Sequence, residues 1–360
     1  MLAGRRNIDK YDIFYFISIF FSVGLAQSWG GFHVAVVDIH THVVPNSLAD
    51  LPARHRLWPT LEMHEGGRAA LVIDGKPFRE IDARSWDVER RMRDMAADGT
   101  DVQVLSPMPE LLSHWLPAEL ADHLARIMND HIVKMIARAP DKFQGIGMVP
   151  MQDVELATKR LDDIQKQGLR GVEIGTHIDG VPLGDPKLTP FYARAEELGL
   201  LVFVHPLHPA GLERIGGPKE LAAAAVFPLE TALAATSLLA GGVLERFPRL
   251  NILLSHGGGA FPWIAPRIEF AWKMAAPWSK AIAQAPSETL KRFWYDTIVY
   301  APASLRFLAD QVGSDRLVVG SDYPFAIRQP GPGAFAASAL KDISFDANAA
   351  VLLGSGRARQ

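Results

Sequence analysis

Eight short apolar segments recur along this chain, and their recurrence constrains the fold more than any other feature. They are rich in Val, Ile and Leu, as buried parallel strands are. Longer amphipathic segments lie between them, and those over residues 87–99, 118–140 and 154–168 predict helices. Eight strands that alternate with helices suit a closed (β/α)8 TIM barrel of the α/β class. The predicted strands are residues 34–40, 101–107, 143–150, 171–175, 200–206, 251–256, 293–299 and 316–322.

The interval between the first two predicted strands departs from this alternation. Residues 43–86 contain several prolines and an Asp74-Gly75 pair flanked by apolar segments, which predicts a tight turn. We therefore expect a small β-hairpin insertion after strand 1, over the barrel mouth. Together, these sequence patterns predict one barrel domain over residues 34–360, with residues 43–86 as its insertion.

Residues 1–33 predict a segment outside the fold. A basic start precedes an apolar run of about 14 residues and a Gly-Leu-Ala sequence, as in a secretory signal peptide. The run is shorter than the roughly 20 residues of a membrane-spanning helix, so no stable membrane partner is expected. Asp9 and Asp12 lie where a signal peptide carries positive charge, which favours a misplaced start codon. We expect a cytoplasmic protein, with export as the alternative.

The composition restricts the chemistry available to the chain. It contains no cysteine, so disulfides and thiolate metal sites are excluded. The formal net charge is -3 and no basic stripe stands out, so no nucleic-acid partner is expected. A metal ion would take imidazole and carboxylate ligands, which suit zinc, iron, cobalt or manganese.

Histidine and aspartate side chains end the first, fifth and eighth predicted strands. His40 and His42 close the segment VVDIHTH, His205 closes LVFVHP, and Asp322 lies in LVVGSDYP. Barrel enzymes carry their chemistry at these strand ends. Three imidazoles and one carboxylate can hold a single divalent ion and leave an open position. A lone buried histidine is more often a core residue, and His208, three residues into the loop, is a weaker alternative to His205.

The direction of the side chains follows from the two-residue period of a strand. Residues two apart share a face, so Asp38, His40 and His42 are expected to face the barrel interior and Ile39 the helix layer. His256 ends the sixth predicted strand and precedes three glycines. It is not needed as a ligand and is therefore free to move protons, although a cap or core contact is the structural alternative.

Four motifs in this order, VVDIHTH, VFVHP, LSHGGGAF and GSDYPF, resemble the decarboxylase branch of the amidohydrolase superfamily. The similarity is greatest to its 2-amino-3-carboxymuconate 6-semialdehyde decarboxylases, and it runs from about residue 36 to the C-terminus. The resemblance implies one zinc ion held by His40, His42, His205 and Asp322, with His256 as the catalytic acid and base.

The same resemblance implies a homodimer and two substrate-binding arginines. Arg79 lies in PFREI on the insertion, and Arg267, in APRIEF, is expected to reach the neighbouring active site. Arginine suits a carboxylate substrate because it stays charged and binds bidentately. Without the resemblance, either arginine would be interpreted as a surface residue. Leu207 and His208 depart from the family pattern, which has Trp-Asp at these two positions.

These observations predict a metal-dependent, non-oxidative decarboxylase, a carboxy-lyase. Its expected substrate is an (amino)carboxymuconate semialdehyde or a related carboxylate of aromatic catabolism, such as tryptophan and kynurenine degradation, with metal-bound water activated by His256. The alternative is a mononuclear metal hydrolase of a lactone or amide, and Glu173 in GVEIG is left open as an extra ligand. A non-catalytic, tethered or secreted metal-binding protein is a third hypothesis.

Overall fold

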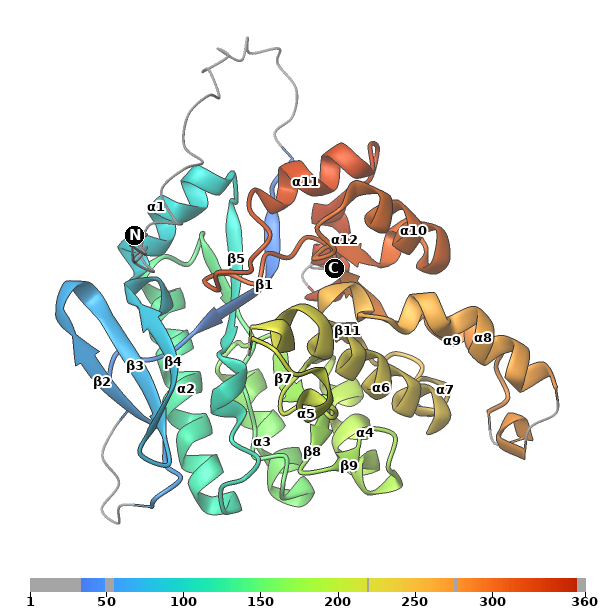
Figure 1. Ribbon diagram of the computed structural model, residues 1–360, viewed down its shortest axis with the longest axis horizontal. Helices are drawn as coiled ribbons and strands as arrows, with labels where there is room; N and C mark the ends of the chain where they lie inside the picture. The colour runs from blue at the N-terminus through green and yellow to red at the C-terminus, as the bar shows by residue number, and fades with distance from the viewer. Residues whose placement is uncertain (1–33, 49–54, 219, 275–276, 281, 355–360) are drawn as a thin grey trace, which may run out of the picture. The chain divides into compact units, whose positions relative to one another are not determined.

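Eight parallel strands alternate with helices in the computed structural model (Figure 1). The structure describes residues 34–48, 55–218, 220–274, 277–280 and 282–354, so the predicted extension 1–33 lies outside the described residues. The strands all fall within the eight segments predicted from the sequence, except that the first extends three residues further. They are β1 (Val37–Val43), β5 (Val102–Pro107), β6 (Phe143–Gly145), β7 (Gly171–Gly175), β10 (Leu201–His205), β11 (Ile252–Leu254), β12 (Trp294–Asp296) and β13 (Leu317–Val318).

Backbone pairing closes these strands into a barrel. Two parallel sheets have the orders β1-β5-β6 and β13-β12-β11-β10-β7. A bridge between Gly147 and Val172 joins β7 to the segment after β6. On the other side, Ile39 N donates to Val319 O at 2.8 Å, which joins β1 to the segment after β13. The (β/α)8 prediction is therefore confirmed.

Helices follow the strands in sequence and have recognisable ends. Asp87 and Asp153 cap α1 and α3 by accepting hydrogen bonds from backbone amides three residues on, and Gly99 ends α1 at a φ of 67°. The three predicted helices are confirmed as α1 (Val88–Asp98), α2 (Ala118–Arg138) and α3 (Val154–Lys166). The others are α4 (Thr189–Leu198), α5 (Leu212–Ile215), α6 (Phe227–Ala240), α7 (Val243–Arg246), α8 (Phe261–Lys273), α9 (Pro286–Leu290), α10 (Pro302–Val312), α11 (Pro332–Ala339) and α12 (Phe345–Leu352).

Apolar side chains form two separate buried clusters, as the alternation of strand residues requires. In β10, Leu201 and Phe203 belong to the inner cluster, which also contains residues of α12, whereas Val202 and Val204 belong to the cluster shared with the other helices. His205 continues the inward-facing series of Leu201 and Phe203. The predicted metal ligand His205 therefore lies on the inner face of the barrel.

The expected directions of Asp38 and Ile39 are wrong, because β1 contains a bulge. The register with β5 shifts between Asp38 and Thr41, and an extra residue in one strand breaks the two-residue alternation. Ile39 therefore packs in the inner apolar cluster. Asp38 instead accepts hydrogen bonds from Ser321 N at 3.0 Å and Ser321 Oγ at 2.5 Å.

The insertion between β1 and α1 is larger than the predicted hairpin. It forms a three-stranded antiparallel sheet of β2 (Thr60–His64), β3 (Arg68–Ile73) and β4 (Lys76–Asp82), seen in blue in Figure 1. Asp74 and Gly75 form the predicted turn between β3 and β4, with φ values of 56° and 67°. A second short antiparallel pair, β8 (His177–Ile178) and β9 (Val181–Pro182), follows β7.

One helical segment among the described residues, Ala222–Ala240, is long and apolar enough to cross a membrane by length and composition. It comprises a π-helical turn and α6, and it lies between β10 and β11 in the chain. Ala234, Ala235 and Leu238 are buried in the apolar cluster between the strands and the helices, whereas Leu229 and Leu233 are exposed. The buried apolar residues of this segment therefore contribute to the core of the fold.

Candidate metal centre

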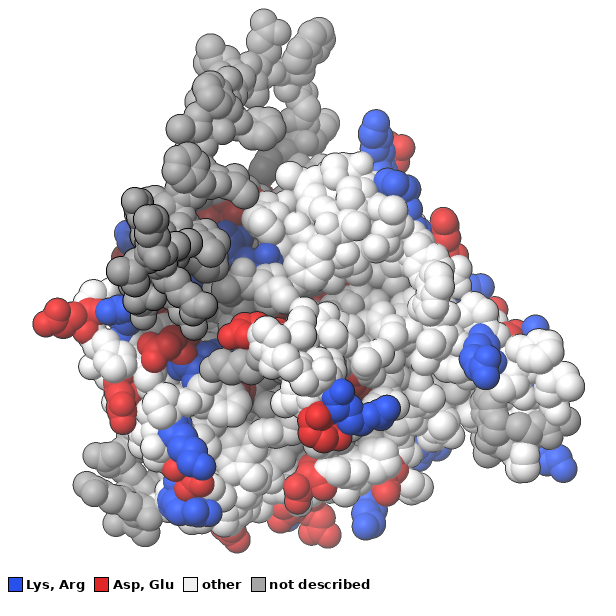
Figure 2. All heavy atoms as spheres, viewed as in Figure 1, with Lys and Arg blue, Asp and Glu red and all other residues white. Residues whose placement is uncertain are grey.

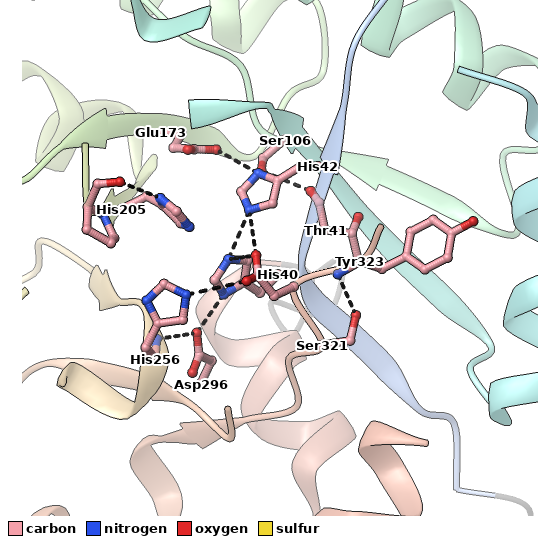
Figure 3. Close-up of polar contacts among 12 residues, drawn as sticks. His40, Thr41, His42, Ser106, Glu173, His205, His256, Asp296, Ser321 and Tyr323 are labelled. Carbon is pink, nitrogen blue, oxygen red and sulfur yellow. Dashed lines mark hydrogen bonds and ion pairs between the residues drawn. The ribbon is translucent and has the colours of Figure 1, made fainter. Parts of the chain in front are cut away.

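Five polar side chains from four strand ends converge inside the barrel mouth (Figure 3). Ligand atoms of His40, His205, His256 and Asp322 all lie within 4.8 Å of one another. His42 joins them, because its Nε2 is 3.0 Å from Nε2 of His40 and 3.2 Å from Oδ1 of Asp322. The structure thus brings together every residue that was predicted to bind the metal and the predicted proton carrier.

Hydrogen bonds fix the orientation of three imidazoles. Nδ1 of His40 lies 2.7 Å from Oδ2 of Asp296. Nδ1 of His42 lies 2.8 Å from the carbonyl oxygen of Pro107, and Nδ1 of His205 lies 3.1 Å from the next residue's carbonyl. An acceptor at Nδ1 places the hydrogen there and leaves the Nε2 lone pair available to a cation.

The resulting cluster of acceptor atoms requires a positive charge. Nε2 of His40 and Nε2 of His42 each lie 3.2 Å from Oδ1 of Asp322. Among the described residues, Nε2 of His205 and Oδ1 of Asp322 are buried and have no hydrogen-bond partner. Buried polar atoms are rarely left unpaired, and facing lone pairs repel, so a divalent cation fits these donors. The nitrogen and oxygen ligand set suits zinc and other first-row ions.

The electrostatics of the individual groups agree with this assignment. Burial lowers the pKa of His42 and holds the pKa of His205 well below its usual range, so both imidazoles are neutral. Burial also disfavours charge on His40, but its hydrogen bond with Asp296 and the nearby carboxylate of Asp322 raise its pKa to about 10. In the absence of metal, a proton on His40 therefore supplies the positive charge that the cluster requires.

Asp296, at the end of β12, is a site residue that the sequence analysis did not single out. Besides its bond with His40, it accepts hydrogen bonds from the backbone amides of His256 at 2.9 Å and Gly257 at 2.8 Å. It therefore orients one predicted ligand and anchors the loop that carries the predicted proton carrier. A carboxylate inside an apolar predicted strand was the available signal, the same signal that identified Asp322.

Two of the central residues have a strained backbone. His256 and Asp322 adopt φ values of 55° and 68°, in the left-handed region that favours glycine. Such strain persists where the surrounding structure enforces it and is common at functional sites. The amide of Asp322 donates to the carbonyl of His40 at 2.9 Å, which holds the aspartate against β1.

Glu173 and His208, the two residues left open by the sequence, contact the site differently. Oε2 of Glu173 lies 3.7 Å from Nδ1 of His42, on the side of the ring away from Nε2. Burial raises the pKa of Glu173 well above its usual range. The ring of His208 packs against Trp115, with centroids 4.9 Å apart. Neither belongs to the group of mutually close ligand atoms.

The two predicted arginines have different surroundings. Arg79 lies over the ring of Phe325 at 4.5 Å, and that ring lies 5.2 Å from the ring of His42. Arg79 is therefore close to the metal centre. Arg267 is an exposed residue of α8, and no contact in the described part of the chain links it to the histidines.

Comparison with known proteins identifies the family. A family model described as amidohydrolase matches residues 37–353. The chain belongs to the amidohydrolase family. This amidohydrolase is 36% identical over 303 residues to the 2-amino-3-carboxymuconate-6-semialdehyde decarboxylase of Dictyostelium discoideum, a match that covers 82% of this chain and 84% of the relative.

The solved structures that are similar to this chain include further decarboxylases. The crystal structure of 5-carboxyvanillate decarboxylase from Sphingomonas paucimobilis has a TM-score of 0.69 and 28% identity, and covers 76% of this chain and 84% of that chain. A dihydroxybenzoic acid decarboxylase from Polaromonas sp. JS666, crystallised with manganese and an inhibitor, has a TM-score of 0.65 and 22% identity over 77% of this chain and 89% of that chain. The latter similarity shows the fold alone.

The resemblance predicted from four motifs is confirmed. This amidohydrolase falls in the decarboxylase branch of the superfamily and is a carboxy-lyase. Its histidine and aspartate cluster supplies a site for a divalent metal ion.

Proposed function

We propose that this amidohydrolase removes CO2, without an oxidant, from an (amino)carboxymuconate semialdehyde or a related unsaturated carboxylate of aromatic catabolism, as in tryptophan and kynurenine degradation. The observation that carries the proposal is the convergence of His40, His42, His205 and Asp322 with His256 beside them. The 36% identity to a carboxymuconate-semialdehyde decarboxylase supports the substrate class.

The metal of this proposal is one zinc ion per chain, held by His40, His42, His205 and Asp322. A divalent ion there supplies Lewis-acid stabilisation of developing negative charge and makes nearby water more acidic. His256 differs from the three histidine ligands because its Nδ1 is buried without a hydrogen-bond partner among the described residues. No partner in the described part of the chain fixes the ring from its Nδ1 side, which suits a group that accepts and returns a proton.

The chemistry replaces a bond from carbon to carboxylate with a bond from carbon to hydrogen. One proton is consumed for each CO2 released, and the electron pair of the broken bond returns to the conjugated system. His256 Nε2 lies 3.6 Å from Oδ2 of Asp322, at the edge of the ligand cluster, and its side chain is 12% exposed. We assign the proton transfer to this nitrogen.

Exposed apolar residues around Arg267 support the proposed homodimer. Trp263 and Phe270 of α8 are 73% and 66% exposed, and Met274, directly after the helix, is 68% exposed. Their spacing places them on one face of α8 with Arg267, and a monomer rarely exposes so continuous an apolar surface. Leu229 and Leu233 add exposed apolar residues from α6, which packs against α8. In the view of Figure 2, white surface extends from α11 towards α6, and charged groups lie around it. A second copy of this chain would cover the surface and receive Arg267 at its own active site.

The direct test is turnover by the zinc-loaded protein. Freshly generated aminocarboxymuconate semialdehyde should lose its ultraviolet absorbance faster than by spontaneous cyclisation, with stoichiometric release of CO2. Substitution His256→Asn should abolish turnover and leave zinc near one per chain, whereas His64→Asn, at an exposed histidine of β2, should change neither. Absence of CO2 release, together with hydrolysis of a lactone panel, would establish the alternative hydrolase.

We also propose that the enzyme acts in the cytoplasm, where small catabolic carboxylates are processed. Mass spectrometry of the native N-terminus distinguishes a shorter cytoplasmic chain from a cleaved or retained N-terminal segment.

A further inference from the structure

Glu110 is a buried carboxylate at the barrel mouth that the reaction described above does not use. It lies in the short 3-10 helix Pro109–Leu112, which follows β5 directly, and it is 4% exposed. Its Oε1 accepts a hydrogen bond from Nε of Arg79 at 2.5 Å and lies 2.5 Å from a second guanidinium nitrogen. Its Oε2 is buried and has no hydrogen-bond partner among the described residues.

The surroundings of Glu110 place it beside the metal centre. The short helix that carries it packs against β7, the strand of Glu173. Burial raises the pKa of Glu173, and the charge of Glu110 adds to that shift. Burial lowers the pKa of His208, beyond β10, and the charge of Glu110 opposes that shift. Glu110 is thus close to groups on two further sides of the barrel mouth, besides Arg79 on the insertion.

The pair of Arg79 and Glu110 has a defined hydrogen-bonding capacity. A guanidinium carries five N–H groups, and Glu110 Oε1 occupies only two of its nitrogens. The side chain of Arg79 is 32% exposed, so its remaining N–H groups are available to a substrate carboxylate. Oε2 is the second oxygen of the carboxylate that binds Arg79, and it is an acceptor that has no partner among the described residues. A ligand that satisfies both must carry a carboxylate and, next to it, a hydrogen-bond donor.

We propose that Glu110 is a specificity-determining residue whose Oε2 accepts a hydrogen bond from an amino or hydroxyl group on the carbon next to the one that bears the substrate carboxylate. This inference rests on the proposed function, because it takes Arg79 as the group that binds the carboxylate. A substrate without that donor leaves Oε2 desolvated and unpaired. An unpaired buried acceptor costs about 1–3 kcal/mol, which corresponds to roughly 5- to 150-fold in affinity.

Calorimetric binding of three simple carboxylates to the zinc-loaded enzyme tests the inference without turnover. The probes are 2-aminobenzoate, which has a donor beside the carboxylate, benzoate, which has neither donor nor acceptor there, and 2-nitrobenzoate, which has an acceptor. The wild-type enzyme should bind 2-aminobenzoate at least about ten-fold more tightly than benzoate, and 2-nitrobenzoate most weakly.

Substitution Glu110→Gln should reverse this order. Arg79 needs an oxygen as its partner, so the amide oxygen takes the place of Oε1 and the amide NH2 takes the place of Oε2. The acceptor that faces the ligand becomes a donor, and 2-nitrobenzoate should then bind more tightly than 2-aminobenzoate. The matched control is Asp122→Asn, which removes a buried carboxylate paired with Arg160 between α2 and α3 and should keep the wild-type order.

Two outcomes would overturn the inference. One is equal affinity of the wild-type enzyme for the three probes. The other is an equal loss of all three affinities in Glu110→Gln, which would make Glu110 a support for Arg79 and nothing more. The proposed decarboxylation fails separately, because a negative CO2 assay with the probe preference intact rejects the reaction and retains the role of Glu110.

Discussion

The geometry of single residues around the metal centre depends on groups that do not bind the metal. Asp296 orients His40 and accepts backbone hydrogen bonds from His256 and Gly257. Burial acts to raise the pKa of Asp296, but its hydrogen bond with His40 holds the pKa below its usual range. A charged acceptor behind a histidine ligand fixes its tautomer and increases its basicity.

Substitution Asp296→Asn should weaken zinc binding by about 10- to 100-fold, because an amide has one oxygen where the carboxylate has two. Competition with a chromophoric chelator measures the affinity. Asp315→Asn, at an exposed carboxylate, is the control. Unchanged zinc affinity in Asp296→Asn would show that the backbone alone holds His40 in place.

Zinc binding should also release a proton from His40. Its pKa is raised to about 10, so at pH 6 it is charged in the metal-free protein, whereas burial keeps His42 and His205 neutral. Zinc binds only the neutral imidazole. We expect release of about one proton per zinc at pH 6 and an affinity that rises with pH towards 10. Calorimetry in buffers of different ionisation enthalpy measures the release, and a value near zero would contradict the raised pKa.

Among the elements, the loop after β11 shows how backbone conformation positions His256. Its glycines follow the histidine with positive φ, and Gly259 has a φ of 59°. A Cβ at Gly259 would lie 1.9 Å from the carbonyl oxygen of Pro228 in α6. The loop and the start of α6 are therefore in direct backbone contact, which only glycine permits.

Substitution Gly259→Ala should lower the free energy of unfolding by about 3 kcal/mol or more, because it adds a backbone collision to an unfavourable φ. Gly99→Ala is the matched control: its φ is 67° and a Cβ there meets nothing within 4 Å. The control should lose only about 1–2 kcal/mol. Urea denaturation measures both values, and equal losses would mean that the contact with α6 adjusts without cost.

For the whole molecule, the proposed homodimer divides the active site between two chains. The barrel supplies the proposed metal ligands and the insertion supplies Arg79, whereas Arg267 lies on the exposed apolar face of α8. In a symmetric dimer the same surface serves both subunits. Each active site would then combine His256 of one chain with Arg267 of the other.

Complementation between two inactive variants tests this arrangement. His256→Asn and Arg267→Ala homodimers should each be inactive or severely impaired. A heterodimer purified with two different tags contains one site in which both residues are intact, so it should regain about half of the wild-type activity. Sedimentation analysis confirms the dimer, and a heterodimer as inactive as its parents would place Arg267 outside the neighbouring site.

The barrel and the five central residues of the site could be predicted from the order of the amino acids. Buried parallel strands must be apolar, and their carboxyl ends meet at one edge, so His40, His42, His205, His256 and Asp322 could be placed together from local patterns alone. The turn at Asp74-Gly75 was equally local, because its residue types tolerate positive φ.

The directions and partners of other residues depended on contacts between distant segments and could not be predicted. The bulge in β1 reversed Asp38 and Ile39, and the insertion gained a third strand through pairing of β2 with β3. Asp296 is hydrogen-bonded to His40, which lies 256 positions earlier in the chain, and Glu110 pairs with Arg79, which lies 31 positions earlier. Local periodicity carries no record of such contacts, because they depend on how distant segments pack.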